Sequence, residues 1–421
     1  MTRTARCLAA LALAWALPAL AQHMHPQQPD GAASAPAAKR RPAPLAMGAV
    51  FSPTGELWVA ALDAQQRLTL KTSADEGRHW SAPRVLETGS DKIAADGENR
   101  PKLAFGPNGS TAGWVVISYT EPLAKPYTGR IRMLRSEDGG RSFSAPLTVH
   151  QDPQLITHRF ESIAFDAQGT LHTLWIDKRD LELQILAAGP VPEAASGAKR
   201  AKPKVEYRGA AIYRNESTDG GKSFGPDLKL ADHSCECCRI ALANAPDGSL
   251  VALWRHVFAP NERDHAFAPV KAGGAEPVRA TLDHWAVDAC PHHGPGLAPA
   301  ASGGYHAVWF GIRAGDARVR YGQLGPDGAP RGEARPLPDE RAEHAAIQSA
   351  GASLVIAWRS FDGQATRWRA WVSADDGLHF TLKELGRSAD ENDHPLLLRR
   401  GQQIFALWRT AQEIHVERLT P

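Results

Sequence analysis

The sequence predicts an all-β fold, a β-propeller of four-stranded antiparallel blades, with seven blades favoured and six possible. Three observations lead to this prediction. A short turn pattern occurs four times, a longer pattern of paired apolar stretches occurs seven times, and the residues within these stretches alternate as strands do. Self-similarity at a regular spacing is typical of repeat architectures, so we expect one large circular domain over residues 45–421.

The longer repeat is an apolar stretch, a turn with Gly, and a second apolar stretch that often ends in Trp. We expect each copy to supply the two inner strands of one blade. The seven copies are residues 45–62, 100–119, 159–177, 239–255, 294–310, 344–359 and 394–409. The last unit has no fourth strand before the chain ends, and the segment near residue 40 could supply it and close the ring.

The shorter repeat reads S-x-D-x-G-x-x-[WF], at residues 73–80, 136–143, 217–224 and 373–380. In a hairpin turn the Asp carboxylate accepts backbone N–H bonds, the Gly takes a positive φ, and the aromatic residue packs back on the sheet. We expect these turns to join the third and fourth strands of their blades. The aspartates with this structural role are Asp75, Asp138, Asp219 and Asp375.

This turn pattern resembles the Asp-box of sialidases and related β-propellers, and four copies in one chain make the resemblance specific. It covers nearly all of residues 45–421 and implies the propeller fold. Sialidases have six blades, which is why six stays open beside the seven that the longer repeat favours. For activity the resemblance is loose, because propellers host many unrelated functions.

The segments outside the repeats are of three kinds. Residues 1–21 have a basic start, an apolar stretch and a small-residue cleavage site, so we expect a signal peptide and export to an oxidising compartment, a bacterial periplasm. Residues 22–44 are rich in Pro and Ala and predict an extended tether. Residues 181–207, rich in Ala, Pro, Lys and Gly, predict a surface loop inserted in the third unit.

Charge and hydropathy limit the partners. The formal net charge is +2, and removal of the signal peptide with its two arginines brings it to 0. We therefore expect no nucleic-acid partner and no attraction to anionic lipid. No stretch is long enough for a membrane span, and no protein partner is indicated.

Cysteines and histidines gather in one structural position. In such a propeller, the loops before the first strand of each blade open on the same face, around the central channel. All cysteines of the mature chain precede such strands. Thiolates and imidazoles at this density suit a thiophilic metal, copper first and zinc as the alternative. The candidate ligands are Cys235, Cys237, Cys238, Cys290, His292, His293 and His233.

Further histidines and arginines share this end of the predicted blades. All of them would line the funnel, and the histidines would serve there as additional metal ligands or as donors that orient the ligands. These funnel-lining candidates are His158, His344, His394, Arg255, Arg359 and Arg409.

The resemblance to sialidases implies an alternative, a glycoside hydrolase that acts on sialic acid or a related acidic sugar. Sialidases hold the substrate carboxylate with three arginines, and bidentate guanidinium–carboxylate bonds explain such a clamp. The residues that would serve here are Arg100, Arg159, Arg239, Glu161 and Asp177. However, the F/Y-R-I-P signature of the first blade is missing and no Tyr stands in the position of the nucleophile. Whether the protein is an enzyme therefore stays open.

A third hypothesis is a non-catalytic module whose loops bind a protein or a glycan. Cysteines of exported proteins usually pair as disulfides, which here would link neighbouring blades. A bond between the adjacent Cys237 and Cys238 would be strained, so a two-disulfide pattern is awkward. We favour the first hypothesis: a periplasmic, sialidase-like propeller that binds a thiophilic metal at the mouth of its channel.

Overall fold

Seven antiparallel sheets follow one another along the chain, as the longer sequence repeat predicts. The computed structural model describes residues 44–107, 109–188, 208–271, 276–289 and 291–421. Within these residues six sheets have four strands and the last has three. Every strand pairs with its neighbour in sequence, so each sheet is a simple meander.

The first four blades have the following strands. Blade one has β1 (Gly48–Phe51), β2 (Leu57–Leu62), β3 (Leu68–Ser73) and β4 (Arg84–Val85). Blade two has β5 (Lys102–Phe105), β6 (Val115–Pro122), β7 (Gly129–Ser136) and β8 (Leu147–Thr148), with the 3₁₀ turn η1 (Gly109–Thr111) between β5 and β6. Blade three has β9 (His158–Phe165), β10 (Leu171–Asp177), β11 (Ala210–Ser217) and β12 (Leu228–Ser234). Blade four has β13 (Ala241–Asn244), β14 (Leu250–Arg255), β15 (His265–Pro269) and β16 (Val278–Arg279).

The last three blades complete the series. Blade five has β17 (Gly296–Pro299), β18 (Tyr305–Arg313), β19 (Asp316–Leu324) and β20 (Pro330–Pro336). Blade six has β21 (Glu343–Ala350), β22 (Ser353–Phe361), β23 (Thr366–Ser373) and β24 (Thr381–Ser388). Blade seven has β25 (Leu396–Arg400), β26 (Gln403–Arg409) and β27 (Ile414–Arg418).

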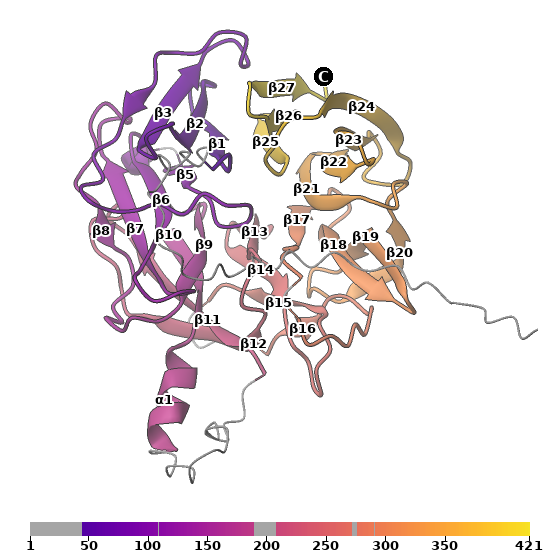
Figure 1. Cartoon of the computed structure of the whole chain (residues 1–421). Coiled ribbons are helices and arrows are strands. Elements are labelled where there is room, and N and C mark those ends of the chain that lie inside the picture. The colour runs from indigo at the N-terminus through magenta and orange to yellow at the C-terminus, as the bar shows by residue number, and fades with distance from the viewer. Residues whose placement is uncertain (1–43, 108, 189–207, 272–275, 290) are drawn as a thin grey trace, which may run out of the picture. The chain divides into compact units, whose positions relative to one another are not determined.

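The sheets form a closed ring (Figure 1). The first strand of each blade contacts the first strand of the next, from β1 through β5, β9, β13, β17 and β21 to β25. Strand β25 contacts β1 in turn, which closes the circle. The seven-bladed propeller is thus confirmed. The fourth strand expected from the segment near residue 40 lies outside the described residues, as do the expected signal peptide and most of the tether.

The core lies between successive sheets. Second strands are largely buried, and β2, β10 and β14 are buried along their whole length, because a sheet packs against each of their faces. Tryptophans near the ends of these strands fill the space between blades, and Trp175, Trp254 and Trp408 are almost fully buried.

The four repeated turns join third to fourth strands and share one set of hydrogen bonds. In the turn of blade three, Ser217 Oγ donates to the Asp219 carboxylate at 2.7 Å. The amide of Ser223 donates to the same carboxylate at 2.9 Å, and the amide of Gly221 donates to Ser217 Oγ at 2.8 Å. Gly221 has φ of 82°, which favours glycine.

The insertion in blade three differs from the predicted loop. Its first part forms a helix, α1 (Arg179–Ala187), and residues 189–207 lie outside the described part of the chain. Leu, Glu and Gln are good helix formers, and Asp180 and Glu182 in the first turn favour the N-terminal end of the helix dipole. No helix among the described residues is long and apolar enough to cross a membrane.

Candidate functional site

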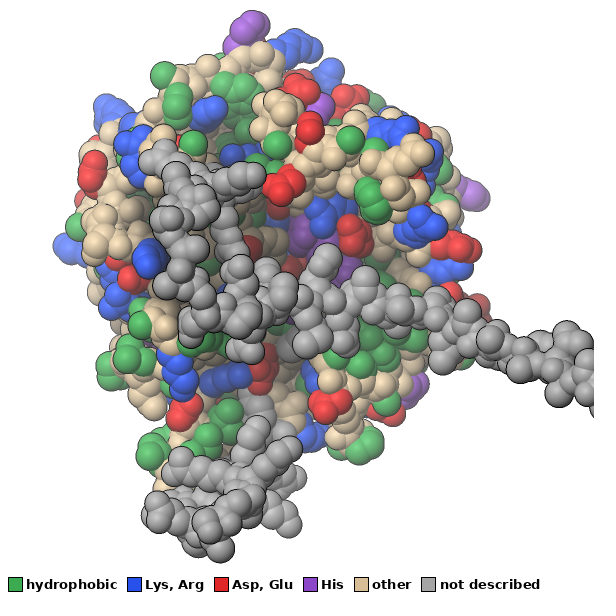
Figure 2. All heavy atoms as spheres, in the orientation of Figure 1, with side chains coloured by type: hydrophobic (Ala, Val, Ile, Leu, Met, Phe, Trp, Pro, Cys, Tyr) green, Lys and Arg blue, Asp and Glu red, His purple; other side chains and the backbone are tan. Residues whose placement is uncertain are grey.

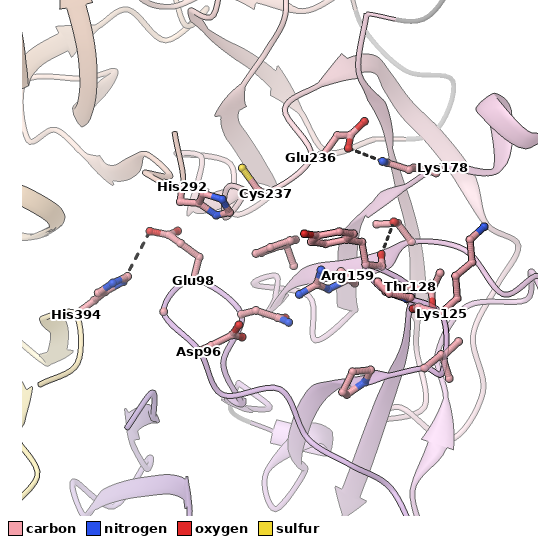
Figure 3. Close-up of a pocket in the computed structure, with 18 of the residues that line it drawn as sticks. Asp96, Glu98, Lys125, Thr128, Arg159, Lys178, Glu236, Cys237, His292 and His394 are labelled. Atoms are coloured by element: carbon pink, nitrogen blue, oxygen red, sulfur yellow. Dashed lines mark hydrogen bonds and ion pairs between the residues drawn. The ribbon is translucent and has the colours of Figure 1, made fainter. Parts of the chain in front are cut away.

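A cavity of about 820 Å³ opens at the end of the ring where the predicted site residues gather. The segment before β5, the β6–β7 loop, the end of β10 and the segments that carry Cys237, His292 and His394 line it (Figure 3). Figure 2 shows histidine side chains with acidic and basic neighbours in the hollow of this face. Of the residues that the sequence analysis named, Arg159, Cys237, His292, His344 and His394 line this cavity.

Backbone strain is concentrated around this cavity. Of the ten described residues other than Gly with positive φ, four line it: Tyr127, Phe160, His292 and His344. Such conformations are uncommon for residues with a Cβ and persist where the surrounding structure requires them, often at functional sites. We therefore treat this cavity as the candidate functional site.

Three cysteines converge beside the cavity, on the segment between β12 and β13. The Cys235 amide donates to the carbonyl of Arg255 at 2.9 Å, which ties this segment to the end of β14. The sulfur of Cys235 lies 3.9 Å from that of Cys237 and 3.9 Å from that of Cys238. All three side chains are buried, and Cys237 faces the cavity. The sulfurs are in contact but are not bonded to one another at these distances.

The Cys238 thiol is protonated at neutral pH. A hydrogen bond to Cys235, together with burial, raises the pKa of Cys238 well above that of an ordinary thiol, although Cys237 and the charge of Arg255 oppose this. Metal ions bind the thiolate, so binding has to release this proton.

Arg255 is buried next to the cysteines, with about 1% of its surface exposed. It donates to the carbonyls of Arg263, His293 and Phe310, and its guanidinium lies over the ring of Trp285. Within the described part of the chain it has no carboxylate partner. A buried charge without a counter-ion is costly, so a negatively charged group near the thiols would balance Arg255.

His265 on β15 is a residue that the sequence analysis missed. It pairs across the sheet with Arg255, its Nδ1 lies 3.3 Å from Thr281 Oγ1, and its buried Nε2 has no hydrogen-bond partner. Burial and the charge of Arg255 lower its pKa well below the usual value, so the ring is neutral, and Cys235 lies near enough to act on it electrostatically. A His on a third strand carries no sequence signal for this position.

Three imidazoles from successive blades form a column at the centre of the ring. The rings of His293 and His344 stack with centroids 4.3 Å apart, and those of His344 and His394 with centroids 3.4 Å apart. Burial and the neighbouring His344 lower the pKa of both His293 and His394 well below the usual value. Neutral imidazoles are the form that binds metals.

Glu98, from blade two, reaches this column. Its Oε1 lies 3.4 Å from His344 Nδ1 and accepts a hydrogen bond from Arg239 at 2.8 Å. Burial raises the pKa of Glu98, but Arg239 and His344 outweigh that effect and lower it far below the usual value. Glu98 is therefore a buried anion that links blades two, four and six.

The candidate hydrolase residues are not gathered around one site. Arg100 makes two hydrogen bonds to the carboxylate of Asp393, at 2.8 and 3.0 Å, and Arg239 is paired with Glu98. Of the three arginines, Arg159 is the one that lines the cavity, and its buried Nε has no hydrogen-bond partner.

The two candidate carboxylates lie inside the blades. Glu161 is fully buried and accepts hydrogen bonds from Ser118 and Thr120. Asp177 is also fully buried and accepts from Trp175 and Arg179. The structure gives both of them partners within the fold.

The predicted funnel and metal residues divide into two groups. His292, His344, His394 and Cys237 line the cavity. Four of the others lie elsewhere: His158 is buried and stacks on His150, Arg359 pairs with Glu343, Arg409 donates to the carbonyls of Leu45 and Leu62, and His233 lines a separate cavity with His256.

At the cysteines, the three sulfurs lie within 4.8 Å of one another. Among the described residues, no imidazole belongs to this group. Cys290 lies outside the described residues. His292 and His293, which the sequence grouped with the thiols, instead line the cavity and join the imidazole column, respectively.

Several cavity residues were not named as site candidates. Lys125 and Tyr127 come from the β6–β7 loop, Lys178 follows β10, and Glu236 stands between the cysteines and pairs with Lys178. These residues follow second strands or precede first strands, and that position in the sequence would have predicted them as cavity residues.

Comparison with known proteins supports the fold. No protein-family model matches this chain, and no curated protein is found to match its sequence. Among solved structures, an ulvan lyase of family PL25 aligns with a TM-score of 0.53 and 12% identity, over 89% of this chain and 92% of the lyase.

Two other solved structures resemble the chain. The Hadza microbial sialidase Hz136 aligns with a TM-score of 0.47 and 15% identity, over 90% of this chain and 66% of the sialidase. The Penicillium chrysogenum alpha-L-arabinanase aligns with a TM-score of 0.48 and 14% identity, over 75% of this chain and 88% of the arabinanase. At these identities the likeness concerns the fold alone. The chain has a seven-bladed β-propeller fold, and its overall fold is similar to that of the ulvan lyase.

Proposed function

We propose that this protein is an exported, periplasmic propeller that binds a thiophilic transition metal, copper first and zinc as the alternative. The ligands are Cys235, Cys237 and Cys238, and Cys290 is a further ligand proposed on sequence grounds. The observation that carries the proposal is the convergence of three buried sulfurs at the edge of the cavity.

The spacing of the sulfurs fits one metal ion. A metal–sulfur distance of about 2.3 Å puts two sulfurs about 3.8 Å apart in a tetrahedral site and about 4.0 Å apart in a trigonal one. The sulfur of Cys235 lies 3.9 Å from each of the other two sulfurs, which agrees with either geometry. Soft thiolate ligands favour Cu(I) and Zn²⁺ over harder cations.

The charge of Arg255 also supports a metal at the thiols. One Cu(I) ion with three thiolates carries two negative charges, and Arg255 beside the cluster has no carboxylate partner in the described residues. The buried guanidinium would then act as the counter-ion of the metal–thiolate group. Because Cys237 lines the cavity, the metal could be reached from that side.

The test compares Cys238→Ser with Ser234→Ala. Ser234 is buried directly before the cysteines and hydrogen-bonds the Cys235 carbonyl, so its variant perturbs the same segment without removing a sulfur. We expect Cys238→Ser to lower Cu(I) affinity by at least about 100-fold, in a competition assay with a chromophoric chelator, since a lost ligand exceeds the 10–100-fold effect of lost ligand-supporting contacts. Equal affinities in both variants would contradict the proposal.

A sugar-directed activity is the second candidate, and the cavity with Arg159 favours it. The buried Nε of Arg159, which has no hydrogen-bond partner, could bind the carboxylate of an acidic sugar. The ulvan lyase of the same fold was solved bound to -[GlcA(1-4)Rha3S]-, so an acidic oligosaccharide belongs beside a fluorogenic sialoside in the assay. Turnover that is lost in Arg159→Ala would support this candidate, and no turnover at high protein concentration would remove it.

A further inference from the structure

Besides the thiols, the cavity contains a second set of metal-binding atoms of different chemistry. Glu98, His344 and His394 all line it, and one ligand atom from each lies within 4.8 Å of the other two. The Nδ1 atom of His394 lies 3.9 Å from Glu98 Oε1, as the dashed line in Figure 3 shows. The three residues come from blades two, six and seven, so the ring has to close to bring them together.

One ligand atom of this set is buried without a hydrogen-bond partner. His394 is about 9% exposed, and its Nδ1 makes no hydrogen bond. Buried polar atoms are nearly always hydrogen-bonded, so an exception calls for an explanation such as an ion that binds there.

The backbone is shaped to fit this arrangement. Gly97 has φ of 56°, and a Cβ on it would lie 3.0 Å from Cε1 of His394. His344 itself has φ of 51°, an uncommon conformation for a residue with a Cβ. Both features hold the two imidazoles stacked beside the carboxylate.

We propose that Glu98, His344 and His394 form a second metal site, for a divalent cation of borderline softness such as Zn²⁺. Two imidazoles and one carboxylate, with a fourth position left open, are a ligand set of zinc sites with an exchangeable position. The open position here faces the cavity, because all three residues line it. The site differs from the thiol cluster in its ligands and in the metals that it prefers.

Arg239 does not block this site. It donates to Glu98 Oε1 from its guanidinium and to Oε2 from its amide, at 2.8 and 3.3 Å. A carboxylate has about four acceptor positions, so a metal bond can coexist with these hydrogen bonds. Glu343, whose Oε2 lies 4.0 Å from His344 Nε2, adds a second negative charge near the column.

Anaerobic titration of the full chain with Co²⁺ tests the proposal, because thiolate and nitrogen–oxygen ligands give different cobalt spectra. We expect the wild type to bind one Co²⁺ ion that absorbs in the visible range but contributes no sulfur-to-cobalt charge-transfer band. Any such band would come from Co²⁺ at the thiols. His394→Gln should weaken the binding of the thiolate-free ion by at least about 100-fold, and leave any charge-transfer band unchanged. His150→Gln is the matched control, since His150 is also a buried, stacked imidazole but does not line the cavity.

The outcomes separate this site from the thiol cluster. A sulfur-to-cobalt charge-transfer band without a second, thiolate-free ion would overturn the second site and leave the thiol proposal standing. A thiolate-free ion without a charge-transfer band would support the second site and count against the thiol proposal. If His394→Gln does not fold, Glu98→Gln, which keeps the shape of the side chain, takes its place. The proposal is contradicted if the wild type binds no thiolate-free Co²⁺. It is also contradicted if His394→Gln and Glu98→Gln both retain this ion at full affinity.

Discussion

The repeated turns and the cavity differ in the pairing of their polar side chains. At the end with the repeated turns, Ser217, Asp219 and Ser223 satisfy one another and the backbone around them. At the cavity end, the side-chain nitrogens Arg159 Nε and His394 Nδ1 are buried without a hydrogen-bond partner. A satisfied network stabilises the fold, whereas groups left unsatisfied are available to a ligand. We interpret the turn residues as structural and the two cavity residues as candidates for ligand binding.

The largest effect on stability is expected at a repeated turn. Gly140 has φ of 82°, and a Cβ on it would lie 2.3 Å from the ring of Trp58. Gly140→Ala should lower the free energy of unfolding by about 3 kcal/mol, from backbone strain and overpacking together. Gly139→Ala is the control, because Gly139 also has positive φ but a Cβ there meets no atom within 4 Å. Equal unfolding midpoints in urea for the two variants would show that the turn does not pack on the blade as described.

A smaller effect is expected at the cavity end, on metal binding. Arg255→Gln removes the buried charge beside the thiols and should lower Cu(I) affinity about tenfold, as about 1.4 kcal/mol of lost charge balance implies. Arg255→Lys should restore most of the affinity because it keeps the charge. Arg409→Gln is the control, since Arg409 also follows a buried Trp at the end of a second strand but lies at another cavity. An unchanged affinity in Arg255→Gln would contradict the charge argument.

A single turn aspartate should contribute less. Asp219→Asn weakens the hydrogen bonds from Ser217, Lys222 and Ser223 and should lower the free energy of unfolding by about 1 kcal/mol. Metal affinity should not change, because the turn joins the outer strands β11 and β12. Loss of metal binding in this variant, with the stability unaltered, would reverse the roles assigned to the two ends.

The smallest effect is expected from acid. Burial raises the pKa of Asp219, but hydrogen bonds from Ser223 and Ser217 outweigh it and lower the pKa to about 2. The folded carboxylate thus binds its proton at lower pH than the unfolded one, whose pKa is 3.8. Its contribution is complete above pH 3.8 and is lost as the pH falls through 2. Unfolding midpoints measured from pH 5 to about pH 2 should fall less steeply in Asp219→Asn than in the wild type; parallel curves would argue against this linkage.

The fold could be predicted almost completely, because the apolar repeat and the turns recur with the blades. The exception is α1, where good helix formers at residues 179–187 stand beside a segment rich in Pro and Gly. The helix propensity of these nine residues is masked by the Pro and Gly content of the whole insertion, which predicts a loop.

The site could be predicted in part. Cys237, His292 and His344, named for their position before first strands, line the cavity. The prediction failed for His158, because this position determines the end of the blade but not the direction of the side chain. Direction depends on local backbone geometry, such as the positive φ of His344, which the sequence does not reveal.

The central claim is that the cysteines bind a metal instead of stapling the blades. Elemental analysis of protein purified from periplasm, paired with a thiol count after denaturation, tests it most directly. We predict stoichiometric copper or zinc, and thiols that react only after the metal is removed. A metal-free protein without free thiols, even after incubation with Cu(I), would contradict the account and leave a disulfide-stapled module.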